Sequence, residues 1–385
     1  MILLGFLCAC NERAACIQIR LLLSVLLAQS TRCYLIKSPR HMTSLTGSTA
    51  QTLAGTVSFP PLSTIFGGCA FQLAALGIVW STLSPFALCV AGDSTSCWRD
   101  PWSRLLLIHL GVCLLVWLYS LRTIPSTGTA DPSIVDRIWS NLPWIYTCAV
   151  AFWLPSPRLY VMAVCSTAWG VRLTTNFIIK GGFSGGEDYR WVEVRKWFEG
   201  APWYFSFEMF NFFFIVNCQL LIVLGFTSPM VLGVYESAAP FGTLDVVATF
   251  LFAAFFAIET IADYQMMAYQ NEKYRRINAK LPLGEYSRGF IETGLWAYSR
   301  HPNYFGELGM WWAYYLFGVA ASGAWINWTL VGPVFLNLLF LPPMASLDLT
   351  EALSSRKYAA YPEYQARVSR FIPWMPATDG VPAQL

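Results

Sequence analysis

Residues 243–266 read TLDVVATFLFAAFFAIETIADYQM, a stretch in which only Asp245, Glu259 and Asp263 carry charge. About 20 predominantly apolar residues are enough for a helix to cross the hydrocarbon core of a bilayer. The stretch therefore predicts a transmembrane helix. Comparable apolar runs recur on both sides of it. We expect about eight spans, at 65–91, 105–121, 138–155, 159–179, 203–225, 243–266, 304–321 and 325–345.

The composition agrees with this pattern. Of the 385 residues 56% are hydrophobic, 16% aromatic and only 12% charged, whereas a soluble domain carries about 25% charged residues. We therefore expect the all-α class, as a polytopic integral-membrane helical bundle. The net charge of +3 is too small to indicate a nucleic-acid partner. The three histidines and the lack of a Cys-x-x-Cys pair predict no bound metal.

The distribution of Lys and Arg orients the spans. Residues 180–200, 270–302 and the tail after 345 are rich in basic side chains, while 226–240 and 322–324 contain none. Cytoplasmic loops of membrane proteins carry the excess of basic residues. The three basic segments are therefore expected on the cytosolic face of a multi-pass protein of the endoplasmic reticulum or another endomembrane.

Three regions follow from these patterns. Residues 1–60 hold two short apolar runs and a basic, Ser/Thr-rich stretch. They fit a targeting segment, which would direct the chain to an organelle, or an extra N-terminal helix. Residues 61–200 form the N-terminal membrane helices. Residues 201–385 form a C-terminal membrane domain whose tail, from Ser346 to Pro373, has the pattern of a polar, partly amphipathic helix.

Glu259 and Asp263 are the first candidate site residues. They stand four residues apart near the cytosolic end of their span, so they share one helix face and repel each other. A cation, a proton or the hydroxyls of a ligand must offset that repulsion. The alternative is a helix end that reaches interfacial water beside Lys273 and Arg275.

A second candidate is the polar run ETGLWAYSRHPNYFGE at 292–307. Pro302 disfavours helix at the residue before it and suits the first turn of the next helix. A helix should therefore begin here with Arg300 beside it, which is a good phosphate or carboxylate site. The alternative is an interfacial anchor whose aromatic side chains lie at headgroup level.

This run, preceded by ETIADYQ and followed by a tail ending in FIPW, resembles the membrane family related to the steroid 5-alpha-reductase C-terminal domain. DPSIVDRIW and GGEDYRW are also similar, and the likeness covers roughly 130–375. Sterol C14/C24 reductases and isoprenylcysteine carboxyl methyltransferase are similar in motif style. Two features depart from the steroid reductases: Glu259 replaces their usual Asn, and the N-terminal half lacks a match to their 3-keto-steroid site.

The resemblance implies a cytosol-facing C-terminal pocket for NADPH. Carried over by position, together with the polar run, the expected cofactor-binding residues are Glu259, Asp263, Arg288, Arg300, His301, Asn303, Tyr304, Glu307, Tyr358 and Tyr364. The implied activity is NADPH-dependent reduction of a lipophilic substrate, at an activated C=C bond of a lipid, sterol-like or isoprenoid compound. Reduction needs a proton donor, for which the candidates are Tyr298, Tyr304, Glu208 and Tyr204.

Two other functions stay open on the sequence. An S-adenosylmethionine-dependent lipid or prenyl-protein methyltransferase shares the Arg-His-Pro style of motif. Such enzymes usually carry paired glutamates at the start of the tail, where this chain has LDLTE at 347–351. A non-catalytic membrane lipid-binding protein is the third reading. The expected partners are a lipophilic small molecule and membrane lipid, and the sequence does not set the oligomeric state.

Overall fold

The computed structural model describes residues 100–121, 131–180, 189–200, 206–234, 238–343 and 345–377. All regular structure in these residues is helical. The expected span at 65–91 and the segment 1–60 lie outside the described residues, as does most of the glycine-rich stretch after Lys180.

The first described helix, α6 (Pro101–Ser120), begins where the Asp100 side chain accepts a hydrogen bond from the Ser103 backbone at 2.8 Å. The expected span at 138–155 is instead two helices, α7 (Ser133–Trp139) and α8 (Leu142–Trp153). Pro143 explains the break, because proline fits only the first turn of a helix without losing a backbone hydrogen bond. The long helix α9 (Pro157–Ile179) and the short α10 (Tyr189–Lys196) follow.

The expected span at 203–225 is built from four consecutive pieces that together cover Phe207–Leu232. They are α11 (Phe207–Phe210), the π-helix η2 (Asn211–Cys218), α12 (Gln219–Thr227) and α13 (Pro229–Leu232). The next helix, α14 (Thr243–Asn278), has 36 residues and is therefore about 54 Å long. It continues past the expected end at 266 and well beyond the roughly 30 Å of a hydrocarbon core.

After α14 the chain makes two 3-10 turns, η3 (Gly284–Arg288) and η4 (Gly294–Ala297), before α15 (Pro302–Ser322). A third turn, η5 (Trp328–Leu330), leads into α16 (Val331–Phe340). The tail is two helices rather than the expected single one: α17 (Ser346–Lys357) and α18 (Tyr361–Arg367). Pro362 again accounts for the break, since it occupies the first turn of α18.

Three of the described helical segments are long and apolar enough to cross a membrane: Pro101–Ser120, Phe207–Leu232 and Thr243–Asn278. Leu142–Trp153 and Trp328–Phe340 are apolar but shorter. The other two long helices, α9 with 23 residues and α15 with 21, carry more polar side chains. The structure is thus compatible with a helical membrane protein.

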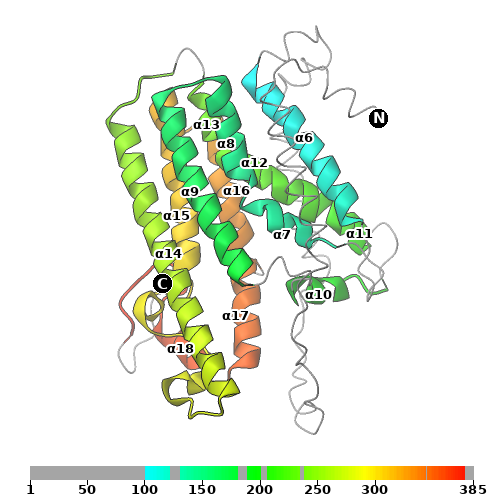
Figure 1. Ribbon diagram of the computed structural model, residues 1–385, viewed down its shortest axis with the longest axis vertical. Helices are drawn as coiled ribbons and strands as arrows, with labels where there is room; N and C mark the ends of the chain where they lie inside the picture. The colour runs from blue at the N-terminus through cyan, green and yellow to red at the C-terminus, as the bar shows by residue number, and fades with distance from the viewer. Residues whose placement is uncertain are drawn as a thin grey trace.

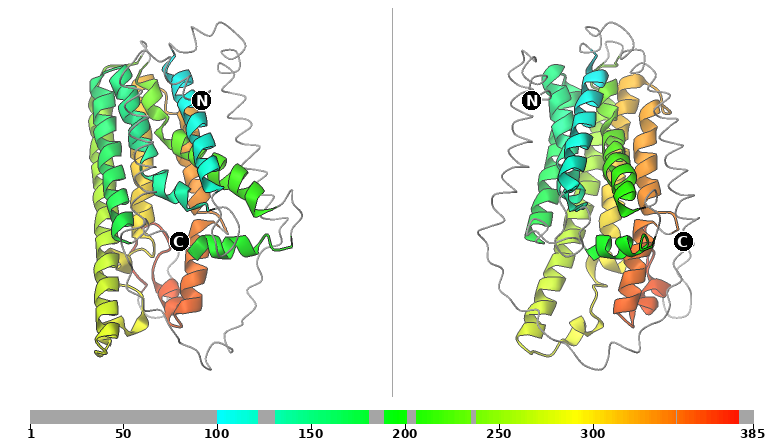
Figure 2. Two further views of the ribbon diagram at one scale, coloured as in Figure 1. Left: turned by 45° about the vertical axis from the view of Figure 1, so that its right-hand side comes forward. Right: turned by 90° about the vertical axis from the view of Figure 1, so that its right-hand side faces the viewer.

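Helices α8, α9, α14, α15 and α16 run side by side as a bundle, with α6 along one edge (Figure 1). The three basic segments predicted to share one face lie at the same end: the end of α9, the extension of α14 and the tail helices. Figure 2 shows α17 and α18 at the same end of the molecule as the part of α14 that projects beyond the bundle. Two clusters of polar side chains occupy this region.

Candidate ligand-binding site

Glycines in α15 set how closely it approaches α14. A Cβ on Gly306 would lie 2.8 Å from the Glu259 backbone nitrogen and 2.9 Å from the Phe255 carbonyl oxygen. A Cβ on Gly309 would overlap the Phe255 ring. Small residues permit this close backbone approach. Because the helices are antiparallel and Glu259 is level with Gly306, Asp263 is level with Asn303 near the start of α15.

One face of α9 completes the site. Trp169, Arg172, Asn176 and Lys180 recur at helical spacing and point toward α14 and α15. Arg172 pairs with Glu259, and its Nη1 donates to Asp263 Oδ2 at 2.8 Å. Asn176 Nδ2 donates to the same oxygen at 2.8 Å, and Lys180 Nζ is 3.9 Å from Asp263 Oδ1. The repulsion predicted between Glu259 and Asp263 is therefore offset by the guanidinium between them.

Glu307 is the third carboxyl group of the cluster. It accepts hydrogen bonds from Trp169 Nε1 at 2.7 Å and from Trp311 Nε1 at 2.8 Å. It also lies close enough to Glu259 and Arg172 to interact with both electrostatically. We call Trp169, Arg172, Asn176, Glu259, Asp263 and Glu307, with Asn303 beside them, the acidic cluster.

The acidic cluster contains buried polar atoms that lack a hydrogen-bond partner among the described residues. They are the acceptors Glu259 Oε2 and Asn303 Oδ1 and the donors Arg172 Nε and Nη2, of which Nη2 is the nitrogen that forms the ion pair with Glu259. Buried polar atoms in folded proteins are nearly always paired, so each exception needs an explanation. Two of these four atoms are acceptors, and a ligand that brings hydroxyl or amide donors would satisfy them.

Arg300 and His301, expected in a cofactor pocket, instead hold the tail. Arg300 Nε donates to Glu351 Oε1 at 2.7 Å, and Arg300 Nη1 donates to the carbonyls of Gln365 and Val368 at 2.8 and 2.6 Å. His301 Nε2 lies 3.0 Å from the same Glu351 oxygen. Burial raises the pKa of Glu351, but the hydrogen bonds from His301 and Arg300 outweigh it and hold that pKa at about 2. Burial lowers the pKa of His301 despite the Glu351 contact.

The expected tail residues belong to the same structural unit. Tyr364 is buried and its hydroxyl donates to the Trp296 carbonyl at 2.6 Å. Tyr358 packs on Phe290, with ring centroids 5.7 Å apart. Arg288 pairs with Glu363 at 2.7 Å and with Glu292 at 3.3 Å. None of these three side chains joins the acidic cluster.

The proton-donor candidates are dispersed. Tyr304 stacks on His301 with centroids 5.5 Å apart, Tyr298 is partly exposed after η4, and Tyr204 lies outside the described residues. Glu208 belongs to α11, on the side of the bundle opposite α14 (Figure 1). Arg172, which occupies the centre of the acidic cluster, is not among the site residues predicted from the sequence. Its signal was an ionisable residue inside an apolar span, which usually faces the protein interior.

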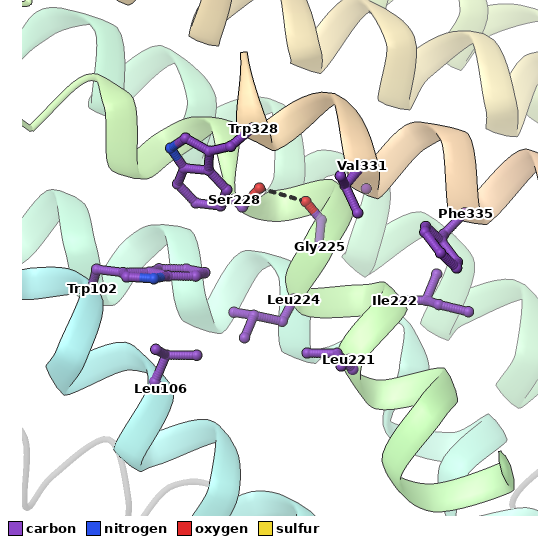
Figure 3. Close-up of a pocket in the computed structure, with 11 residues that line it drawn as sticks. Trp102, Leu106, Leu221, Ile222, Leu224, Gly225, Ser228, Trp328, Val331 and Phe335 are labelled. Atoms are coloured by element: carbon purple, nitrogen blue, oxygen red, sulfur yellow. Dashed lines mark hydrogen bonds between the residues drawn. The ribbon is translucent and has the colours of Figure 1, made fainter. Parts of the chain in front are cut away.

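A separate apolar pocket lies between α6, α12 and α16 (Figure 3). Trp102, Leu106, Trp328 and Phe335 are among its lining residues, and the Ser228 hydroxyl donates within its own helix to Gly225. Its volume is about 40 Å³, far below the roughly 300–1,000 Å³ of typical ligand sites. The pocket is too small for a nucleotide.

The described residues form an all-helical structure with three helical segments long and apolar enough to cross a membrane, and a charged cluster where α9, α14 and α15 meet. The chain belongs to the family described as protein of unknown function DUF1295, which matches residues 124–368 and so includes the whole acidic cluster. An uncharacterized protein of Schizosaccharomyces pombe is 35% identical over 266 residues, covering 64% of this chain and 74% of the relative. No solved structure matches the chain.

Proposed function

We propose that this protein is a multi-pass membrane reductase that uses NADPH and binds the cofactor's nicotinamide–ribose end at the acidic cluster. The observation that carries the proposal is the pair of buried oxygens Glu259 Oε2 and Asn303 Oδ1, for which the described residues supply no hydrogen-bond donor, although Arg172 pairs with the other oxygen of Glu259. Ribose hydroxyls and a carboxamide are donors of the kind these atoms lack. The resemblance of 259–265 and 292–307 to the steroid 5-alpha-reductase-related family supports the same cofactor.

Each residue of the cluster has a distinct part in this proposal. Asn303 and Glu259 would accept from the ligand, while Arg172 holds the Glu259 and Asp263 carboxylates in place. Lys180 is exposed and stands 3.9 Å from Asp263, so it is the cation best placed for a phosphate. When bound, NADPH would supply the hydride for reduction of the lipophilic substrate.

The phosphate contacts predicted from the sequence, Arg288 and Arg300, have to be replaced in this proposal. The guanidinium of Arg300 is engaged with Glu351 and two tail carbonyls, and that of Arg288 with Glu292 and Glu363. A planar guanidinium binds phosphate through pairs of N–H groups. Those of Arg300 are already used, and both terminal nitrogens of Arg288 are engaged, which leaves only its Nε without a partner among the described residues. We therefore assign Arg300 a structural role and move the proposed phosphate contact to Lys180.

Further spans belong to the same proposal. Helices α9 and α15 are as long as a bilayer requires. Arg172 of α9 and Glu307 of α15 face the acidic cluster, and Arg158 of α9 is buried in an ion pair with Asp245 of α14. With α8 and α16, helices α9 and α15 would extend the three clear spans toward the expected eight. The endomembrane location and the cytosolic placement of the basic end stay predictions.

One observation favours the methyltransferase reading. The acidic cluster contains three carboxyl groups but one buried guanidinium, that of Arg172. An excess of carboxylates suits a cation, and S-adenosylmethionine carries a sulfonium charge together with ribose hydroxyls. The same acceptors would then serve a different cofactor.

A ligand titration separates the two. The full chain, purified in detergent, is titrated with NADPH, NADH and S-adenosylmethionine, and binding is followed by intrinsic tryptophan fluorescence, to which Trp169 and Trp311 contribute beside the site. The reductase proposal expects saturable binding of NADPH and none of S-adenosylmethionine. Binding of S-adenosylmethionine alone would establish the alternative, and binding of neither would remove both.

A further inference from the structure

Exposed apolar side chains mark the lipid-facing surface of α14. Val246, Phe250, Ile261 and Tyr264 are all exposed along it. A hydrocarbon core of about 30 Å accommodates about 20 helical residues, so a helix that enters at Thr243 leaves near residues 262–264. Tyr264, with 65% of its side chain exposed, is therefore at headgroup level, where Tyr and Trp are enriched.

Two hydrogen bonds set the position of η4 along the axis of α14. Trp296 Nε1 donates to the Ala262 carbonyl at 3.0 Å, and the Leu295 backbone N–H donates to Gln265 Oε1 at 2.9 Å. Residues 295–298 are thus tied to the part of α14 that leaves the bilayer.

The end of the tail is attached to this same level. The Trp374 backbone N–H donates to the Tyr298 carbonyl at 2.9 Å, and Ser299 Oγ donates to the Phe371 carbonyl at 2.8 Å. The Phe371 ring also packs on Phe305 of α15. In Figure 1 the red segment after α18 turns back from the tail helices toward α14 and α15. We call residues 371–377 the tail hook.

The tail hook presents large apolar side chains outward. Ile372, Trp374 and Met375 have 53%, 59% and 72% of their surface exposed, although the backbone beside them is hydrogen-bonded and Phe371 is packed. Tyr298 is exposed beside them. An apolar patch of this kind marks an interaction site, and the contacts above hold this one at the level of α14 where Ile261 and Tyr264 are exposed.

We propose that the tail hook inserts into the headgroup–acyl boundary of the bilayer, with Trp374 and Met375 as the anchoring side chains. The partner is lipid because the hook is held at the level where α14 leaves the membrane. The segments 279–301 and 345–377, which lie outside α15 and α16, then rest against the leaflet. The tail hook at their C-terminal end holds them there. This inference does not depend on the proposed activity.

Photolabelling in a bilayer tests the proposal. The full chain is reconstituted into phosphatidylcholine vesicles that contain a lipid with a diazirine in the upper acyl chain, and labelled peptides are identified by mass spectrometry after irradiation. The peptide with Phe250 is the positive control, and residues 279–288, which lie beyond the membrane end of α14, are the negative control. We expect label on 371–377. Label on the Phe250 peptide with none on 371–377 would overturn the proposal.

A second measurement, tryptophan quenching, does not depend on how well each peptide is detected by mass spectrometry. Trp374→Phe removes one exposed indole while keeping an apolar ring, so it should leave folding intact. Tryptophan quenching by brominated lipid should fall in this variant relative to the unmodified chain. Equal quenching of both proteins would show that Trp374 faces water or another protein.

Discussion

Replacing Gly306 by alanine should force α14 and α15 apart and so disturb the acidic cluster. The new Cβ would lie 2.8 Å from the Glu259 backbone nitrogen and 2.9 Å from the Phe255 carbonyl oxygen. Both are backbone atoms, which cannot swing aside as a side chain can. The helices must therefore separate by several tenths of an ångström, and overpacking of this kind costs about 1–3 kcal/mol.

Gly111→Ala is the matched control, because a Cβ at this position of α6 has no atom within 4 Å. Alanine in place of a helical glycine gains roughly 0.5–1 kcal/mol from backbone entropy. Both variants share this gain, so the stability gap between them isolates the overpacking. Gly309→Ala should fall between the two, since its Cβ meets only the Phe255 ring.

Thermal unfolding of the three purified variants in one detergent measures the gap. We expect Gly306→Ala to be the least stable and Gly111→Ala to equal or exceed the unmodified chain. If Gly306→Ala is as stable as Gly111→Ala, the close approach of α14 and α15 is wrong, and the register that places Asp263 level with Asn303 fails with it.

Three further predictions concern charge and burial. Arg172→Met should destabilise the fold by about 3–5 kcal/mol, because it leaves buried carboxylates without their cation, whereas Arg275→Met, at an exposed pair with Glu272, should change the unfolding temperature little. Tyr364→Phe should cost about 1–3 kcal/mol by leaving the Trp296 carbonyl without its donor, and Tyr298→Phe should be nearly neutral in the same unfolding assay. The Glu351 pKa of about 2 lies below its ordinary 4.5, so the carboxylate stabilises the tail above about pH 4.5 and this stability is lost as the pH falls toward 2. Glu351→Gln should remove that part of the acid sensitivity in unfolding followed at decreasing pH, and an unchanged profile would contradict the assignment.

The sequence was sufficient to predict the helical class and the shared helix face of Glu259 and Asp263, because these follow from apolar run length and a four-residue spacing. Pro302 also indicated that a helix begins there. The predicted end of α14 at 266 was wrong, because residues 267–278 are polar but are good helix formers. The apolar run therefore ends before the helix does.

The partners of charged groups were beyond sequence reasoning. Arg172 is 91 residues from Asp263 along the chain, and only the packing of α9 on α14 brings them together. Arg300 has the sequence surroundings of a phosphate site, but Glu351, in the segment LDLTE, takes its guanidinium. A single sequence gives the type and spacing of charged residues but does not show with which distant residue each of them pairs.

The central proposal is that the acidic cluster binds the ribose end of NADPH through acceptors for which the described residues supply no hydrogen-bond donor. The most direct test is Asn303→Ala, because Asn303 Oδ1 has no hydrogen-bond partner among the described residues. NADPH affinity should fall by a factor corresponding to about 1–3 kcal/mol, roughly five- to 150-fold, while the unfolding temperature without ligand stays unchanged. Unaltered NADPH affinity, or the lack of saturable NADPH binding by the unmodified chain, would contradict the proposal.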